Sequence, residues 1–217
     1  NNYSTAYNDS LGIEKLQKYA SLFGLNERTG IEIEEAAPQI ANEFPVMAAI
    51  GQSNNNYTTV QLARYVTAVA NEGTVYQYTL LNRLEDSDGN VLQTFEPQVR
   101  NQIDVLDTEE WNAIHSGMRM VVENTKEFDG FPIEAAGKTG TAQQNLKRPN
   151  HALFVGYAPY DDPEISIATR IAYGYTSHNA AKLARNVFAY YFNVENEDEL
   201  LNGQAANGNS SSNEISD

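Results

Sequence analysis

The sequence contains no cysteine, and this absence excludes several kinds of chemistry at once. A chain without thiols forms no disulfide, has no thiolate nucleophile and offers no thiolate to a metal ion. The absence of cysteine does not indicate the redox compartment, because such a chain suits a reducing or an oxidising environment. Histidine is also scarce, and the spacing of the three residues is not that of metal ligands, so no metal site is expected. They are His115, His151 and His178.

Positive charge is in short supply as well. The chain has 14 lysines and arginines against 29 aspartates and glutamates, which gives a formal net charge of −15. Nucleic acids and anionic lipid surfaces attract basic patches, so we expect no nucleic-acid partner and no polybasic contact with a membrane. The acidic balance indicates solubility and says little about the fold.

Long apolar runs and an N-terminal signal pattern are both missing. No run approaches the roughly 20 residues that a membrane-spanning helix needs. The chain opens with Asn1 rather than methionine, and we interpret it as a segment of a longer protein. Its hydrophobic content of 41% fits one sizeable domain with its own core. Residues 194–217 are acidic and rich in Asn, Gly and Ser, which predicts a disordered tail.

Helical periodicity predicts helices over residues 11–23, 58–71, 107–122 and 178–192. Thr58 with Gln61, and Asp107 with Glu110, have the spacing of capping boxes. Each helix has an apolar stripe that we expect to be buried. The candidate core residues are Leu11, Leu16, Tyr19, Ala20 and Phe23 in the first helix; Val60, Ala63, Tyr65, Val66, Val69 and Ala70 in the second; Trp111, Ile114, Met118 and Val121 or Val122 in the third; and Ala181, Leu183, Ala184, Val187, Phe188 and Tyr191 in the last.

Strand signals fall into two groups. Ser87-Asp88-Gly89-Asn90 is a hairpin turn signal between β-rich runs, and it predicts a hairpin insertion at about 74–99. Three successive strands are expected nearer the C-terminus, and their connections favour antiparallel pairing. The fold class is therefore mixed α/β (α+β), an antiparallel sheet with packed helices. The expected strands cover residues 31–33, 75–84, 91–95, 135–143, 151–158 and 164–172.

The stretch Gly137-Lys138-Thr139-Gly140-Thr141-Ala142 lies in the first of those three strands. Strand alternation places Lys138 and Gly140 on one face, and Thr139 and Thr141 on the other. The lysine attracts a carboxylate by roughly 1 kcal/mol at about 4 Å in water, and by about 4 kcal/mol at an effective dielectric constant near 20. Threonine hydroxyls can orient that carboxylate, and Gly140 allows close backbone approach. These residues predict a carboxylate-binding strand with an oxyanion donor; the alternative is a chance tripeptide at an exposed strand end.

Flanking segments give this motif a context. Ala49-Ile50-Gly51-Gln52, followed by residues 58–63, resembles the Ile-Gly-Gln-Gly … Thr-Pro-Leu-Gln-Leu-Ala run of the penicillin-binding protein transpeptidase domain. Residues 136–143 with residues 151–159 are similar to the third and fourth strands of that family. The resemblance is greatest to class B, high-molecular-weight members. It departs at Ser53, where glycine is usual, and at Thr59, where proline is usual.

The resemblance implies that residues 1–193 are the C-terminal part of a penicillin-binding/β-lactamase-like transpeptidase domain. Such a domain cross-links peptidoglycan: a serine is acylated by a D-Ala-D-Ala stem peptide, and the acyl group then passes to an amine. β-Lactams acylate the same serine, and no cofactor is implied. Lys138, Thr139, Gly140 and Thr141 would bind the substrate, with Lys138 and the backbone N–H of Thr141 also serving catalysis.

The resemblance also carries expectations about place and partners. It implies a location on the extracytoplasmic face of a bacterial membrane, anchored by a segment outside this chain. Cell-wall synthesis proteins are possible partners.

The nucleophile of this family is missing from the 217 residues. No serine has a lysine three positions later; Ser116 comes nearest, with Arg119, and arginine does not act as a base. The strings Ser53-Asn54-Asn55 and Ser211-Ser212-Asn213 match Ser-x-Asn, but both lie out of place. We therefore expect the Ser-x-x-Lys and Ser-x-Asn motifs upstream and this chain alone to be inactive.

Two alternatives stay open. The chain is a non-catalytic binding or scaffolding domain, or its parent is a D,D-carboxypeptidase or a β-lactamase. The long region between Gly51 and Gly137 favours the larger synthases over the latter pair.

Overall fold

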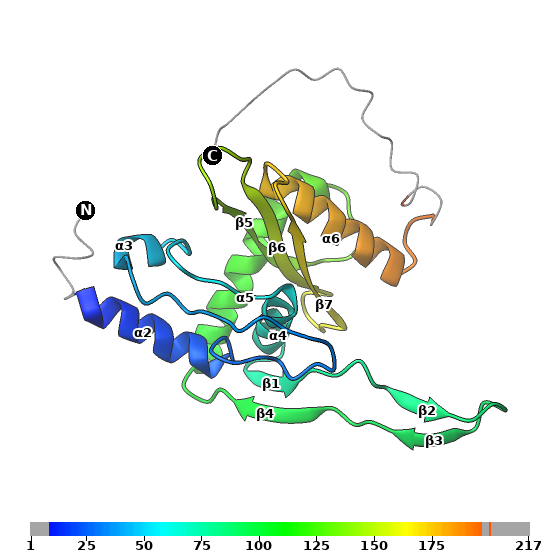
Figure 1. The fold of residues 1–217 in the computed structure, drawn as a ribbon. Coiled ribbons are helices and arrows are strands. Elements are labelled where there is room, and N and C mark those ends of the chain that lie inside the picture. The colour runs from blue at the N-terminus through cyan, green and yellow to red at the C-terminus, as the bar shows by residue number, and fades with distance from the viewer. Residues whose placement is uncertain (1–8, 197–199, 201–217) are drawn as a thin grey trace.

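The computed structural model describes residues 9–196 and 200, and it shows a helix-covered antiparallel sheet with a long β arm (Figure 1). The predicted mixed fold class is therefore confirmed. Most of the expected tail over 194–217 lies outside the described residues. In chain order the elements are α2 (Asp9–Leu22), α3 (Pro45–Ala48), α4 (Thr59–Ala70), β1 (Thr74–Gln77), β2 (Arg83–Glu85), β3 (Val91–Thr94), β4 (Gln98–Gln102), α5 (Thr108–Glu123), the short 3₁₀ helix η1 (Lys126–Phe128), β5 (Ala136–Ala142), β6 (His151–Ala158), β7 (Ile165–Ile171) and α6 (Ser177–Tyr191).

The three C-terminal strands form one sheet in the order β5-β6-β7, antiparallel throughout, as the sequence predicts. In the paired register, Gly140 lies opposite Leu153, and Leu153 lies opposite Arg170. Cross-strand partners share a face, so this row and the row of Lys138 lie on the same side of the sheet. Within the described residues, β5 and β7 are the edges of this sheet.

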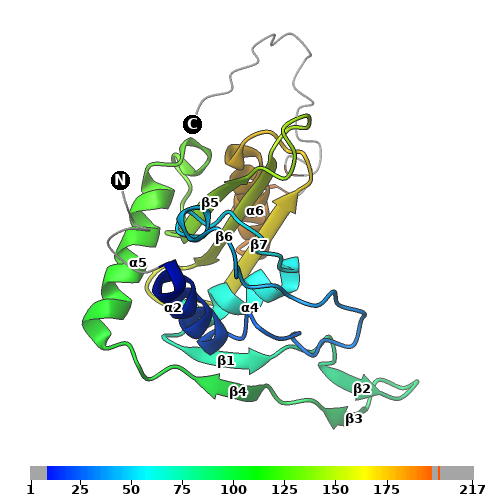
Figure 2. The same ribbon diagram turned by 60° about the vertical axis from the view of Figure 1, so that its left-hand side comes forward.

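Helices cover both faces of this sheet (Figures 1 and 2). On one face, α6 packs against Phe154, which is fully buried. The hydroxyl of Thr169 on β7 donates to the carbonyl oxygen of Ala180 at 3.0 Å and ties that helix to the sheet. On the other face lie α4 and α5, where Val66 packs with Ala136 and Tyr157. The sheet is thus the middle layer of the domain.

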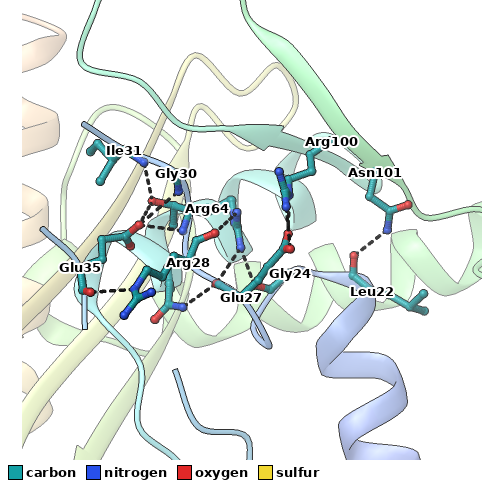
Figure 3. Close-up of polar contacts among 12 residues, drawn as sticks. Leu22, Gly24, Glu27, Arg28, Gly30, Ile31, Glu35, Arg64, Arg100 and Asn101 are labelled. Carbon is teal, nitrogen blue, oxygen red and sulfur yellow. Dashed lines mark hydrogen bonds and ion pairs between the residues drawn. The ribbon is translucent and has the colours of Figure 1, made fainter. Parts of the chain in front are cut away.

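Helix α4 begins as predicted, with both bonds of the Thr58–Gln61 capping box present. Asp107 and Glu110 form the second predicted box at the start of α5. The sequence did not predict that Arg64, in the middle of α4, is 1% exposed. Its guanidinium donates to the carbonyl oxygens of Gly24, Glu27 and Arg28, which lie in the loop after α2 (Figure 3).

The β arm consists of two short antiparallel pairs, β1 with β4 and β2 with β3, and it projects from the body (Figure 1). The predicted hairpin is confirmed. The expected single strand over 75–84 is wrong, because the chain leaves the β conformation between Gln77 and Arg83. There the Tyr78 hydroxyl bonds that of Thr67 at 2.6 Å, and the Leu80 N–H donates to the Glu32 carboxylate. Strand β4 was not anticipated.

The expected strand over residues 31–33 is also wrong, since the structure has an irregular loop there. The Glu35 carboxylate accepts bonds from the backbone N–H groups of Thr29 and Gly30, so the chain folds back on a side chain instead of pairing with a strand (Figure 3). Ile33 is 61% exposed.

Five candidate core residues lie at the surface. In α6 the buried seam is formed by Ala180, Ala181, Ala184 and Phe188, because small side chains let the helix approach the sheet closely. The larger apolar residues therefore face outward. The residues wrongly expected in the core are Leu183, Val187 and Tyr191 in α6, Ile114 in α5 and Tyr19 in α2.

Candidate active site

A cleft of about 640 Å³ opens between one end of β5 and the loop that precedes α4. Its walls are residues 50–53 and 55–57, the first turn of α4, β5 from Lys138 onward with the residues after it, and the cleft-facing side of β6 and β7. The lining residues that matter below are Ser53, Tyr57, Lys138, Thr139, Gly140, Thr141, Gln144, His151 and Arg170. All four predicted site residues thus lie together in one cleft wall.

Strand β5 exposes its outer edge to this cleft. In an antiparallel pair alternate residues direct their N–H and C=O groups away from the partner strand, so an edge strand offers backbone donors to an extended ligand. Lys138 and Gly140 share the face that α4 covers farther along the sheet, while Thr139 and Thr141 lie on the other face. No hydrogen bond joins the hydroxyl of Thr139 or Thr141 to another residue in the described part of the chain.

Gly137 and Gly140 of β5 differ in whether packing within the chain leaves room for a side chain. A Cβ on Gly137 would lie 2.3 Å from Cζ of Phe154 and 2.8 Å from the carbonyl oxygen of Val155, so packing requires glycine there. A Cβ on Gly140 would lie 3.5 Å from Cβ of Leu153, which is ordinary contact. Packing within the chain does not demand glycine at Gly140. Its missing side chain instead leaves the cleft wall open at this point.

The cleft carries positive charge in a strongly acidic protein. Lys138 is exposed, and its Nζ donates to the carbonyl oxygen of Thr139 at 2.8 Å. Arg170 is the other cationic residue in the wall. The described residues that line the cleft include no aspartate or glutamate. The site is therefore suited to an anionic ligand.

His151 connects the loop after β5 with the loop after β7 at one end of the cleft. The backbone N–H of Tyr173 donates to its Nδ1 at 3.0 Å, so the proton of the neutral ring resides on Nε2. Nε2 then donates to Oε1 of Gln144 at 2.8 Å. Burial lowers the pKa of His151, and the neighbouring Arg170 charge lowers it further. The neutral imidazole holds Gln144 in the cleft wall.

The wall opposite β5 is held by its own polar bonds. Ser53 has a φ of 80°, in the region that favours glycine, and its hydroxyl donates to the carbonyl oxygen of Glu43 at 2.5 Å. Asn55 Oδ1 accepts bonds from the Ala41 N–H and the Tyr57 hydroxyl, both at 2.8 Å. Burial raises the pKa of Tyr57 to about 12, so this phenol acts as a donor and not as a base near neutral pH. The Ser53-Asn54-Asn55 string therefore stabilises the loop.

The remaining histidines have structural partners. Nε2 of His115 lies 2.7 Å from the carbonyl oxygen of Val69, and Nδ1 of His178 lies 2.8 Å from the Glu127 carboxylate. Across residues 9–196 and 200, no group of three or more His, Cys, Asp or Glu is arranged to hold a metal ion.

Sequence reasoning missed His151 and Arg170 as cleft residues. Strand alternation puts Arg170 on one of two faces, but only the register with Leu153 and Gly140 puts it on the same face as Lys138. That register depends on pairing across the sheet, which no local pattern reveals.

Comparisons with known proteins agree with the resemblance. The family model described as "Penicillin binding protein transpeptidase domain" matches residues 1–189. The peptidoglycan D,D-transpeptidase MrdA of Haemophilus influenzae is 33% identical over an alignment of 227 residues, gaps included, which covers 88% of this chain and 34% of the relative. The chain thus spans about a third of the length of this curated relative.

Two solved structures share the fold. Penicillin-binding protein 2B of Streptococcus pneumoniae strain R6 matches with a TM-score of 0.75 and 24% identity, over 88% of this chain and 34% of that one. Penicillin-binding protein A of M. tuberculosis, solved as an imipenem acyl-enzyme complex, matches with a TM-score of 0.73 and 22% identity, over 85% of this chain and 44% of that one.

Proposed function

The chain belongs to the penicillin-binding protein transpeptidase family, and on that premise we propose that it is part of a peptidoglycan D,D-transpeptidase. We assign residues 1–193 to the C-terminal part of the catalytic domain. The observation that carries the proposal is the position of the edge strand β5. It brings Lys138, Thr139, Gly140 and Thr141 into a cleft whose described lining contains no aspartate or glutamate.

In the proposed reaction, β5 binds the extended C-terminus of a stem peptide. Lys138 attracts the terminal carboxylate, and the hydroxyls of Thr139 and Thr141 orient it. Gly140 leaves room for the peptide backbone. The N–H of Thr141 donates to the carbonyl oxygen as it becomes an oxyanion; one such donor is worth about 2.7–4 kcal/mol in a well-studied protease.

A serine hydroxyl completes the chemistry. Its oxygen attacks the carbonyl of the penultimate D-Ala, the terminal D-Ala leaves as the amine, and an ester to the enzyme remains. An amine of a second stem peptide then attacks the ester and restores the serine. The 217 residues contain no Ser-x-x-Lys, so we propose that the nucleophile comes from elsewhere in the complete gene product.

β-Lactams are the second proposed ligand class, because they combine a carboxylate with a reactive amide in the same relative positions. The acyl-enzyme form of the M. tuberculosis relative supports this proposal. None of the described helices is long and apolar enough to cross a membrane. We propose the outer face of the cell membrane as the location, with the anchor outside this chain and cell-wall synthesis proteins as neighbours.

The test is covalent labelling with a fluorescent penicillin. The complete product of the gene that encodes this chain is expected to be labelled in a one-to-one ratio, whereas residues 1–217 alone are not. Lys138→Ala should slow labelling of the complete product, because the carboxylate loses its cation. Lys182→Ala, on the exposed side of α6, is the matched control and should label at the parental rate. Equal rates for both variants would refute the role of Lys138.

A non-catalytic scaffold is the second candidate, and the missing Ser-x-x-Lys is the observation that favours it. The same labelling experiment decides between the two. A scaffold predicts that the complete gene product stays unlabelled by penicillin. Incubation with a D-Ala-D-Ala peptide and an acceptor amine then separates a transpeptidase, which forms a new amide, from a carboxypeptidase, which releases D-Ala to water.

A further inference from the structure

Three segments meet around one side chain at the end of the cleft. The ring of His151, the first residue of β6, accepts the Tyr173 N–H through Nδ1 at 3.0 Å and bonds Oε1 of Gln144 through Nε2 at 2.8 Å. Tyr173 belongs to the loop after β7, and Gln144 belongs to the loop after β5. Because His151 is buried, water competes little for these bonds, and they set the arrangement of both loops.

The loop after β7 holds an unfavourable backbone conformation at this place. Tyr173 has a φ of 55° and Tyr175 a φ of 66°, in the left-handed region that bulky residues rarely adopt. Hydrogen bonds hold both residues there, since the Tyr173 N–H donates to His151 and the Tyr175 N–H donates to the carbonyl oxygen of Asn150 at 3.1 Å. Such strain persists only where the surrounding structure imposes it, and it concentrates at binding and active sites. This end of the cleft is therefore preorganised.

The bond from Tyr173 decides which atoms of Gln144 remain available. A backbone N–H only donates, so Nδ1 of His151 is the acceptor and the proton of the neutral ring lies on Nε2. Nε2 then donates to Gln144, which has to accept through Oε1; Nη2 of Arg170, 3.4 Å from the same ring nitrogen, is itself a donor and offers no acceptor. The amide nitrogen of Gln144 keeps two N–H groups, and no hydrogen bond joins them to another residue within 9–196 and 200.

Gln144 lines the cleft three residues beyond Thr141. In the proposed reaction, Lys138 holds the terminal carboxylate and the Thr141 N–H binds the carbonyl oxygen of the penultimate D-Ala, so the peptide runs antiparallel to β5. Three residue rises of about 3.4 Å separate Thr141 from Gln144 by up to about 10 Å. Gln144 thus lies opposite the peptide residues two or three positions before the penultimate D-Ala. Backbone carbonyl oxygens are acceptors that every peptide offers there.

We infer that Gln144 is a substrate-binding residue that donates to a backbone carbonyl oxygen two or three residues before the penultimate D-Ala, with His151 as its positioning residue. The inference rests on the proposed function. The recognised group is a neutral amide acceptor, which distinguishes this contact from the charge pairing at Lys138. Because a donor that is already fixed loses less conformational freedom on binding, the bond from His151 strengthens the contact.

Two penicillins that differ only in the acyl group on the amino nitrogen test the inference on the complete gene product. One carries an acetyl group, and the other carries acetyl-triglycyl, which adds the backbone carbonyls that Gln144 would bind. The second-order rate constant of covalent labelling is measured for each by intact-mass spectrometry. Gln144→Met should slow labelling by the longer penicillin about three- to tenfold, as loss of one hydrogen bond between neutral groups does, and leave the acetyl penicillin at the parental rate.

Gln144→Glu separates this role from a structural one. The glutamate still accepts from Nε2 of His151 but has no N–H, so it should lose the longer penicillin's advantage as Gln144→Met does. His151→Asn keeps an acceptor near the Tyr173 N–H but does not reach Gln144, and it should give a similar loss. His151→Gln can place an amide nitrogen where Nε2 lies, so it should restore part of the rate.

Gln93→Met, in the exposed β3 of the arm, is the matched control and should keep both parental rates. Equal slowing of both penicillins by Gln144→Met, or a parental rate with the longer penicillin in Gln144→Glu, would overturn the inference. Equal rates for both penicillins in the parental protein would also overturn it, while leaving the proposed function intact. A gene product that is labelled by neither penicillin would overturn the proposed function itself.

Discussion

The backbone N–H of Tyr173 donates to Nδ1 of His151 at 3.0 Å, and this bond joins the loop after β7 to the first residue of β6. Nε2 of the same ring donates to Gln144 in the loop after β5. The rings of His151 and Tyr173 also pack with their centroids 4.9 Å apart. One neutral imidazole thus connects the two loops at the end of the sheet that borders the cleft.

Acid should weaken this connection. Burial and the Arg170 charge lower the pKa of His151 below its ordinary value of 6.5, so on acidification the unfolded chain takes up a proton before the folded one does. The stabilising contribution is complete above pH 6.5 and falls as the pH decreases toward the folded pKa. Urea unfolding at several values between about pH 7.5 and 5.5 measures this loss, in a range above most carboxyl titrations. His151→Gln should flatten the pH dependence, and an unchanged slope would contradict the assignment.

A proline at position 59 should stabilise the domain. Thr59 is the first residue of α4, where the N–H lacks an intrahelical acceptor and proline is favoured. Thr58 has φ −75° and ψ 156°, an extended conformation that a following proline permits. We expect Thr59→Pro to raise the free energy of unfolding by about 0.4–1 kcal/mol, as measured by urea denaturation. Thr67→Pro, inside the same helix, is the control and should cost about 3 kcal/mol or more.

Local patterns predicted the parts of this fold that depend on local physics. The capping box at Thr58 starts α4 with bonds between residues only three positions apart, so sequence spacing is enough to recognise it. The three C-terminal strands and their antiparallel order follow from apolar runs with connections between neighbours. The site motif around Lys138 was visible because its residues are consecutive.

The parts that were missed depend on distant partners. Leu183 was expected in the core because it belongs to an apolar stripe with helical spacing. That spacing does not reveal that the alanines of α6, and not Leu183, pack against the sheet. The strand expected over 31–33 is absent because the chain turns back there. The Glu35 carboxylate accepts bonds from the backbone N–H groups of Thr29 and Gly30, just before the expected strand. Arg170 could be assigned to the cleft only from the register of three strands.

Removal of the Arg64 guanidinium should strongly lower the free energy of unfolding, because this group connects α4 to the loop after α2. The side chain is 1% exposed and donates to three backbone carbonyls in that loop. Arg64→Met keeps much of the volume but leaves these acceptors unsatisfied, at about 1–3 kcal/mol for each one that water cannot reach. We expect a loss of about 3 kcal/mol or more in urea denaturation. Arg83→Met, at an exposed ion pair, should change stability by less than about 1 kcal/mol, and a similar loss in both variants would contradict this account.

Alanine at the two glycines of β5 should separate folding from function. A Cβ at Gly137 would overlap the Phe154 ring and the Val155 carbonyl oxygen, so Gly137→Ala should destabilise the sheet by about 1–3 kcal/mol. At Gly140 the new methyl group meets Leu153 at 3.5 Å, an ordinary contact, so stability should change little. The methyl group would nevertheless narrow the cleft where a ligand backbone is proposed to lie against β5. We therefore expect Gly140→Ala in the complete gene product to unfold at the parental urea concentration while reacting with fluorescent penicillin at least tenfold more slowly. Parental labelling kinetics in a fully folded Gly140→Ala protein would show that ligands do not approach β5 at this glycine.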